Sequence, residues 1–195
     1  NKYLIDYWHP EYLGILKLSG LFEKLGLMIK GTEDIVFIFA LSGIAAILYE
    51  ELLGKKHLKK GRNRSLKFLI IFPIIMFLCY LAVTIYGKVN IIYGDFLAYG
   101  TCSAIVLLKR RDLIKHALIS GIFMGLFFLI FLLIFTRIYP GIVDAWWVLN
   151  KTSGIFLLGI PLEEILWAFF VGLWAGPAYE FILGLKEKRI VSKGE

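Results

Sequence analysis

Long runs of apolar residues separated by short polar stretches dominate this chain. Four runs are long enough to cross a bilayer, which takes about 20 apolar residues, and they cover residues 35–53, 66–86, 113–137 and 160–183. A fifth run, 91–108, is shorter and contains Asp95, and we interpret it as a further span. Residues 1–30 mix apolar and charged positions, which favours an interfacial helix. The pattern predicts an all-α, polytopic transmembrane helical bundle of about five spans with an interfacial N-terminal segment.

Part of this pattern occurs twice. A shift of 130 positions aligns ten residues between 33 and 56 with residues between 163 and 186 without a gap, as nine identities and one Asp-for-Glu exchange. Among them, Glu33, Asp34 and Glu50 align with Glu163, Glu164 and Glu180. So many matches indicate an internal repeat, about 8–60 and 138–190, inside a single transmembrane domain, 1–190. The counterpart of 113–137 would precede residue 8, so we expect a missing N-terminal span. Residues 191–195 resemble the start of green fluorescent protein, and we expect a fusion or tag remnant.

Composition and charge agree with a membrane protein. Of 195 residues, 59% are hydrophobic, against about 45–50% in soluble domains, and the mean hydropathy is +0.76. The net charge is +7, but basic residues cluster in 54–67, in 109–115 and after Gly184. The positive-inside rule makes these segments cytoplasmic in a multi-pass cell-membrane protein. We therefore expect contacts with membrane lipids and no nucleic-acid partner. Glu33 and Glu163 then lie near the extracytoplasmic side.

Small residues recur within both repeats. Ser42 and Ala46 are four apart, and the repeat places Gly172 and Gly176 at the same offset. Such pairs allow neighbouring helices to approach closely. The sequence predicts close helix contacts on this face of both helices.

Two adjacent acids begin each repeat-related span, Glu33-Asp34 and Glu163-Glu164. One acid in a first helical turn is explained by the helix macrodipole. Adjacent residues project about 100° apart, so the second acid faces neighbouring helices, where carboxylates are costly and usually functional. Neighbouring carboxyls in an apolar site favour one protonated and one ionised group, an acid and a base. Nearby candidates for stabilising a cation or lining a substrate site are Phe37, Trp167, Phe169, Trp174 and Asp95.

These residues resemble a known family. Gly159-Ile160-Pro161-Leu162-Glu163-Glu164 followed by Trp167 is similar to the Pro-x-Glu-Glu-x-x-Phe signature of the membrane-integral lycopene cyclase domain family. Thr32-Glu33-Asp34-x-x-Phe37 is similar to its first-repeat version but lacks the proline. The resemblance implies a carotenoid-metabolism enzyme that cyclises a linear polyene, a hydrophobic isoprenoid lipid, by protonation without net redox change. Glu163 and Glu164 would be its catalytic pair, with Glu33 and Asp34 as counterparts.

Other functions remain as alternatives. The main one is a non-catalytic membrane protein that binds an apolar ligand or couples proton movement to transport. A prenyl-processing protease needs an arginine where Ala168 stands, and we expect His9, His57 and His116 at or outside the membrane boundaries. That placement disfavours a metal site. The sequence contains no Gly-x-Gly-x-x-Gly motif, which would have predicted a nucleotide cofactor. We expect neither a metal nor a cofactor.

Overall fold

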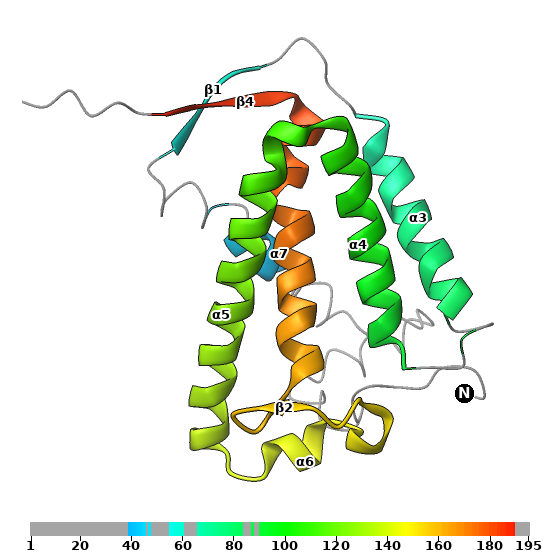
Figure 1. Cartoon of the computed structure of the whole chain (residues 1–195), viewed down its shortest axis with the longest axis vertical. Coiled ribbons are helices and arrows are strands. Elements are labelled where there is room, and N and C mark those ends of the chain that lie inside the picture. Colours follow the sequence, from blue (N-terminus) through cyan, green and yellow to red (C-terminus); the bar gives the residue numbers. More distant parts are fainter. Residues whose placement is uncertain are drawn as a thin grey trace, which may run out of the picture.

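Helices that run roughly along one axis form most of the part of the chain that the structure describes (Figure 1). The computed structural model describes residues 39–45, 47, 55–60, 66–83, 87 and 90–189, which are mostly helical. The helices are α3 (Phe68–Ala82), α4 (Ile92–Lys109), α5 (Ile114–Ile138), α6 (Ile142–Trp146) and α7 (Leu162–Leu183), with 3-10 turns η3 (Arg111–Leu113) and η4 (Leu149–Lys151). Four short strands are β1 (Lys55–Lys60), β2 (Phe156–Leu157), β3 (Ile160–Pro161) and β4 (Leu185–Arg189). The strand pairs lie at opposite ends of the bundle (Figure 1).

Two helical stretches among the described residues are long and apolar enough to cross a membrane, Arg111–Ile138 and Leu162–Leu183. Helix α3 is apolar but has 15 residues, and α4 carries Asp95 in its first turn. Each span predicted after residue 60 is therefore a helix, with ends close to the predicted ones. Of the first predicted span, 35–53, residues 39–45 and 47 are described, and they are helical. The five-span bundle and its repeat stay predictions.

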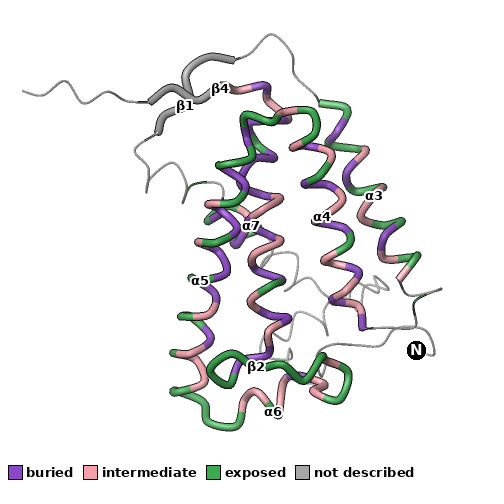
Figure 2. The backbone as a smooth tube through the Cα atoms, viewed as in Figure 1, coloured by how far each residue is buried: buried purple, intermediate pink, exposed green. Residues whose placement is uncertain are grey.

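Helix α7 forms the centre of the bundle. In the most apolar 18 residues of α7, 56% of the residues are buried, against 33% in the corresponding stretch of Arg111–Ile138. Buried positions follow its whole length in Figure 2. The largest core cluster joins α7 to residues of α4, α5 and the helical residues 39–45, including Leu41 and Ala45. Ala175, the counterpart of Ala45 at the 130-residue offset, belongs to the same cluster. Leu41 and Ala45 therefore share one core with α7.

Helices α5 and α7 touch through small residues. A Cβ atom built on Gly172 would lie 2.5 Å from the carbonyl oxygen of Ser120, and one built on Gly176 would lie 2.6 Å from Ser120 Oγ. Neither position has space for a methyl group, because such separations are shorter than a van der Waals contact. The prediction of close approach at Gly172 and Gly176 is confirmed. Ala46 lies outside the described residues, so the matching contact in the first repeat stays a prediction.

The short strands correct the prediction of a purely helical fold. Beyond each helix end the backbone needs new hydrogen-bond partners, and antiparallel pairing supplies them between β1 and β4 and between β2 and β3. Strands β2 and β3 are joined by Leu158 (φ 55°) and Gly159 (φ 85°). Positive φ at both positions of a two-residue loop is typical of a type I′ hairpin. This hairpin leads the chain directly into α7, where the two adjacent acids stand.

Candidate functional site

Two carboxylates are buried in the first turn of α7. Glu163 and Glu164 are 2% and 1% exposed, and the helix begins immediately after Pro161. Free amides at a helix N-terminus favour acids there, but they do not require burial. The segment that follows α6 supplies this burial, together with the start of α4.

Glu163 accepts hydrogen bonds from two separate segments. Its Oε1 atom accepts one from the backbone amide of Ser153 and one from the hydroxyl of Tyr93 in α4, at 3.4 Å. Its Oε2 atom is buried and has no hydrogen-bond partner among the described residues. One oxygen of this carboxyl is therefore fixed in place by two donors, while the other is buried without a donor among the described residues.

Glu164 accepts a hydrogen bond from an indole. Its Oε1 atom lies 2.7 Å from Nε1 of Trp147, which is itself 2% exposed. Trp147 and Ser153 both belong to the segment between α6 and β2, so one loop contacts both acids. Asn90 ties this loop to α4, since its Nδ2 donates to the carbonyl of Lys151 and its Oδ1 accepts from the amide of Ile92.

Asp95 and Trp167 meet one turn deeper in the bundle. Nε1 of Trp167 donates to Oδ2 of Asp95 at 3.1 Å, which links α7 to α4. The Trp167 ring lies 5.7 Å from that of Phe128 in α5, centroid to centroid. The structure therefore brings four residues predicted from the sequence to one end of the bundle: Glu163, Glu164, Asp95 and Trp167.

Comparison with known proteins finds a family similar to this part of the chain. Residues 90–182 match a family model described as lycopene cyclase. This segment, slightly less than half of the chain, is similar to the lycopene cyclase family. We find no match to the chain among curated proteins or among solved structures. The family resemblance inferred from the Pro161-to-Trp167 motif is confirmed, and the matched segment contains α4 to α7 with both buried acids.

The other predicted site residues do not lie beside Glu163 and Glu164 in the described part of the structure. Phe169 packs on α5 at Gly121, and Trp174 packs edge-on against Phe72 of α3, with centroids 4.4 Å apart. The structure does not bring these two rings to the hydrogen bonds of Glu163 and Glu164. Three further candidates, Glu33, Asp34 and Phe37, lie outside the described residues.

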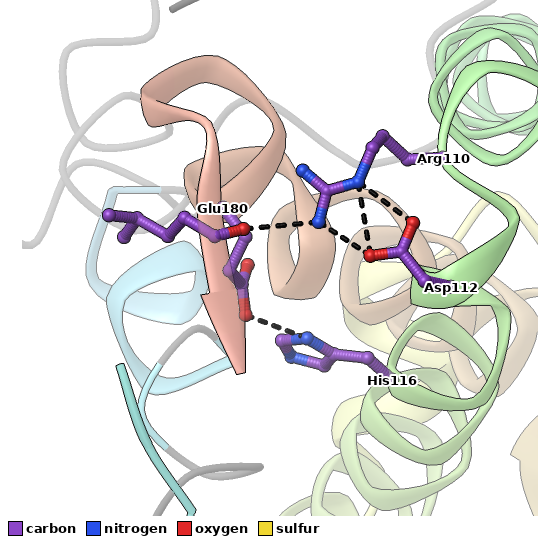
Figure 3. A network of polar contacts seen from close by, with 5 residues as sticks. Arg110, Asp112, His116 and Glu180 are labelled. Atoms are coloured by element: carbon purple, nitrogen blue, oxygen red, sulfur yellow. Dashed lines mark hydrogen bonds and ion pairs between the residues drawn. The ribbon is translucent and has the colours of Figure 1, made fainter. Parts of the chain in front are cut away.

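One buried pair lies at the other end of the matched segment. His116 is 1% exposed near the start of α5, and its place relative to the membrane boundary stays a prediction. Its Nδ1 atom lies 2.7 Å from Oε1 of Glu180 near the end of α7 (Figure 3). The pair stands seventeen residues along α7 from Glu163, about 25 Å at 1.5 Å per residue. His116 follows the basic run 109–115, and its position on α5 turns the side chain towards Glu180 of α7.

The site formed by Glu163, Glu164, Asp95 and Trp167 has groups that can donate and accept a proton. Adjacent buried acids can serve as proton donor and acceptor, and the indole of Trp167 offers an aromatic face to a developing cation. Sequence reasoning did not assign Tyr93, Trp147, Ser153 or Asn90 to the site. The aromatic residues around position 147 were visible, but nothing in the sequence indicated which of Trp146 and Trp147 turns inward. Among the described residues, no three His, Cys, Asp or Glu side chains group as a metal ion requires.

Proposed function

We propose that the protein is a membrane enzyme of carotenoid metabolism that cyclises a linear polyene by acid/base catalysis, without net redox change. The family match supports a carotenoid cyclase-like function. The observation that carries the chemical proposal is the burial of Glu163 and Glu164 side by side, each accepting a hydrogen bond from a neighbouring segment. Such burial is costly for carboxylates, and it is usual at functional sites.

In this proposal the two acids exchange a proton with the substrate. One carboxyl protonates a terminal carbon–carbon double bond of the polyene, which leaves a carbocation. A second double bond of the same chain attacks the cation and forms the ring bond. The other carboxylate then removes a proton from a ring carbon, which leaves a new ring double bond. The product is an isomer of the substrate, so no oxidant, reductant or cofactor is consumed.

The neighbouring groups have supporting roles. Trp167 would stabilise the cation with its ring face, while its bond to Asp95 fixes the orientation of the indole. Trp147 and the Ser153 amide would hold the two carboxyls in position. Glu33 and Asp34 would provide the equivalent acids of the first repeat. Leu41 and Ala45 support this arrangement, because they belong to the same core cluster as residues of α7.

We further propose a multi-pass location in the cell membrane. The two long apolar helices support insertion into a bilayer. The basic segments would face the cytoplasm by the positive-inside rule, with Glu163 near the extracytoplasmic side. The substrate would be a hydrophobic polyene or isoprenoid lipid that reaches the acids from the bilayer.

Pigment analysis in a host that accumulates lycopene tests the enzymatic proposal. The unaltered chain should convert lycopene to a cyclic isomer of identical mass, separated by chromatography. Glu163→Gln and Glu164→Gln should each remove most conversion, because an amide can neither donate nor accept the proton in the same way. Asp112→Asn is the control, since this acid is exposed at the far end of the bundle, and it should convert lycopene normally.

Unchanged lycopene with the unaltered chain, confirmed as folded in the membrane, would remove the cyclase proposal. The alternative of an apolar-ligand carrier would then be tested by co-purification of pigment with the protein. Equal conversion by both glutamine variants would also contradict the roles given to the two acids.

A further inference from the structure

Asn90 is a buried polar residue that stands just before α4. Its side chain is 3% exposed, so both ends of its amide need hydrogen-bond partners within the protein. The Nδ2 atom donates to the carbonyl of Lys151 at 3.3 Å, and the Oδ1 atom accepts from the backbone amide of Ile92 at 3.1 Å. Lys151 is 61 residues away in the sequence. One side chain therefore joins the start of α4 to the loop between α6 and β2.

The bonds of Asn90 to its own segment fix the first turn of α4. The amides of this turn have no partners inside the helix. The side-chain oxygen of Asn90 accepts from Ile92, and its backbone carbonyl accepts from the amide of Tyr93 at 3.2 Å. The hydroxyl of Tyr93 in turn donates to Oε1 of Glu163 at 3.4 Å. The position of this donor therefore depends on how Asn90 begins the helix.

The bond from Asn90 to Lys151 fixes the loop. Lys151 is the last residue of the turn η4, and Ser153 follows it by two residues. The backbone amide of Ser153 donates to the same oxygen of Glu163 that the Tyr93 hydroxyl reaches. Because the connection from Lys151 to Ser153 is so short, a shift of the Lys151 carbonyl also moves the Ser153 amide.

Both donors of Glu163 are thus positioned by one residue. A carboxylate oxygen has about two lone-pair sites, so the Tyr93 hydroxyl and the Ser153 amide together occupy Oε1. The other oxygen, Oε2, is buried and has no hydrogen-bond partner in the described part of the chain. Two donors that hold one oxygen also decide the direction in which the other oxygen points.

We propose that Asn90 is a positioning residue for the proton exchange at Glu163. It acts through Tyr93 and Ser153, and it does not itself touch the substrate. Without the bond from Asn90 to the loop, the two donors would no longer converge on Oε1, and the carboxyl would lose its fixed orientation. This role depends on the proposed function, because it concerns the same acid.

Steady-state conversion of lycopene by the purified full chain tests this role. Asn90→Ser and Asn90→Asp each keep an oxygen for the Ile92 amide but lose the donor to Lys151. The control Thr136→Val removes another side-chain bond to a backbone carbonyl, at 3.0 Å to Leu133, at the same end of the bundle. We expect kcat to fall about tenfold or more in both Asn90 variants while KM stays within about twofold, since a misplacement of about 1 Å is costly in the transition state. The control should keep both constants.

Hydrogen exchange measured by mass spectrometry follows the same link without substrate. In the Asn90 variants the amides around Tyr93 and Ser153 should exchange at least about tenfold faster than in the unaltered chain, because local opening becomes easier. The amides of α5 should keep their exchange rates in these variants, and Thr136→Val should leave the amides around Tyr93 and Ser153 unchanged.

The possible failures can be told apart. No conversion by the unaltered chain would remove the proposed function itself. Conversion by the unaltered chain with an unchanged kcat in both Asn90 variants would overturn the role of Asn90 and leave the function standing. Faster exchange that extends over α5 would also overturn it, because Asn90 would then support the whole fold and not the acid.

Discussion

Replacing Gly172 by alanine should force α5 and α7 apart. The new Cβ atom would lie 2.5 Å from the Ser120 carbonyl oxygen and 2.8 Å from Cβ of Met124, whereas non-bonded carbon atoms settle at about 3.5–4.0 Å. The helices must therefore separate by about 1 Å, and a gap of this size forfeits roughly a quarter to a half of the dispersion attraction across it. Overpacking of this kind costs about 1–3 kcal/mol. For a chain of this length, that lowers the midpoint of thermal unfolding by about 2–12 °C.

The assay is tryptophan fluorescence during heating of the detergent-purified protein. Gly100→Ala is the matched control, because its Cβ atom would lie 3.5 Å from Cε1 of Phe170, an ordinary contact. Alanine also favours a helix over glycine by about 1 kcal/mol, so the control should unfold at the same temperature or higher. A midpoint for Gly172→Ala equal to that of the control would refute the close contact between α5 and α7.

Two further changes test the buried polar groups. Glu180→Gln replaces the carboxylate beside His116 by an amide, and a buried hydrogen-bonding group that loses its partner costs about 1–3 kcal/mol. The thermal midpoint should fall, whereas a midpoint within 1–2 °C of the unaltered chain would show that the pair contributes little. Trp147→Phe keeps an aromatic ring but removes the hydrogen-bond donor to Glu164. Losing a hydrogen bond to a charged group costs about 1.5–3 kcal/mol, so lycopene conversion should drop about tenfold or more while the membrane yield of protein stays normal. Full conversion by this variant would show that the indole does not position the acid.

Much of the helical framework could be predicted from hydrophobic runs alone. The predicted span 160–183 is close to α7, Leu162–Leu183, and the helix is flanked by Pro161 and Gly184, both of which have strong local conformational preferences. The small residues at 172 and 176 correctly indicated a close helix contact. These features depend on local sequence, which is why they needed no knowledge of the packing.

The contacts between distant segments could not be predicted in the same way. His116 stands just after a basic run, and only the rotation of α5 against α7 decides that it faces Glu180. Likewise, the antiparallel pairing of β1 with β4 joins segments that lie far apart in the sequence. The Trp147 contact depends on the path of the loop after α6. Such choices arise from the tertiary arrangement, which hydrophobic periodicity does not encode.

The loop that contributes Trp147 and the Ser153 amide reaches both acids at once. Under the proposed function, substitutions in this loop between Trp147 and Ser153 would reshape the surroundings of both carboxyls at once, while the helices that carry them stay unchanged. Exchanging residues 148–152 between relatives, with Trp147 and Ser153 kept, would then test whether the loop influences which substrate is accepted.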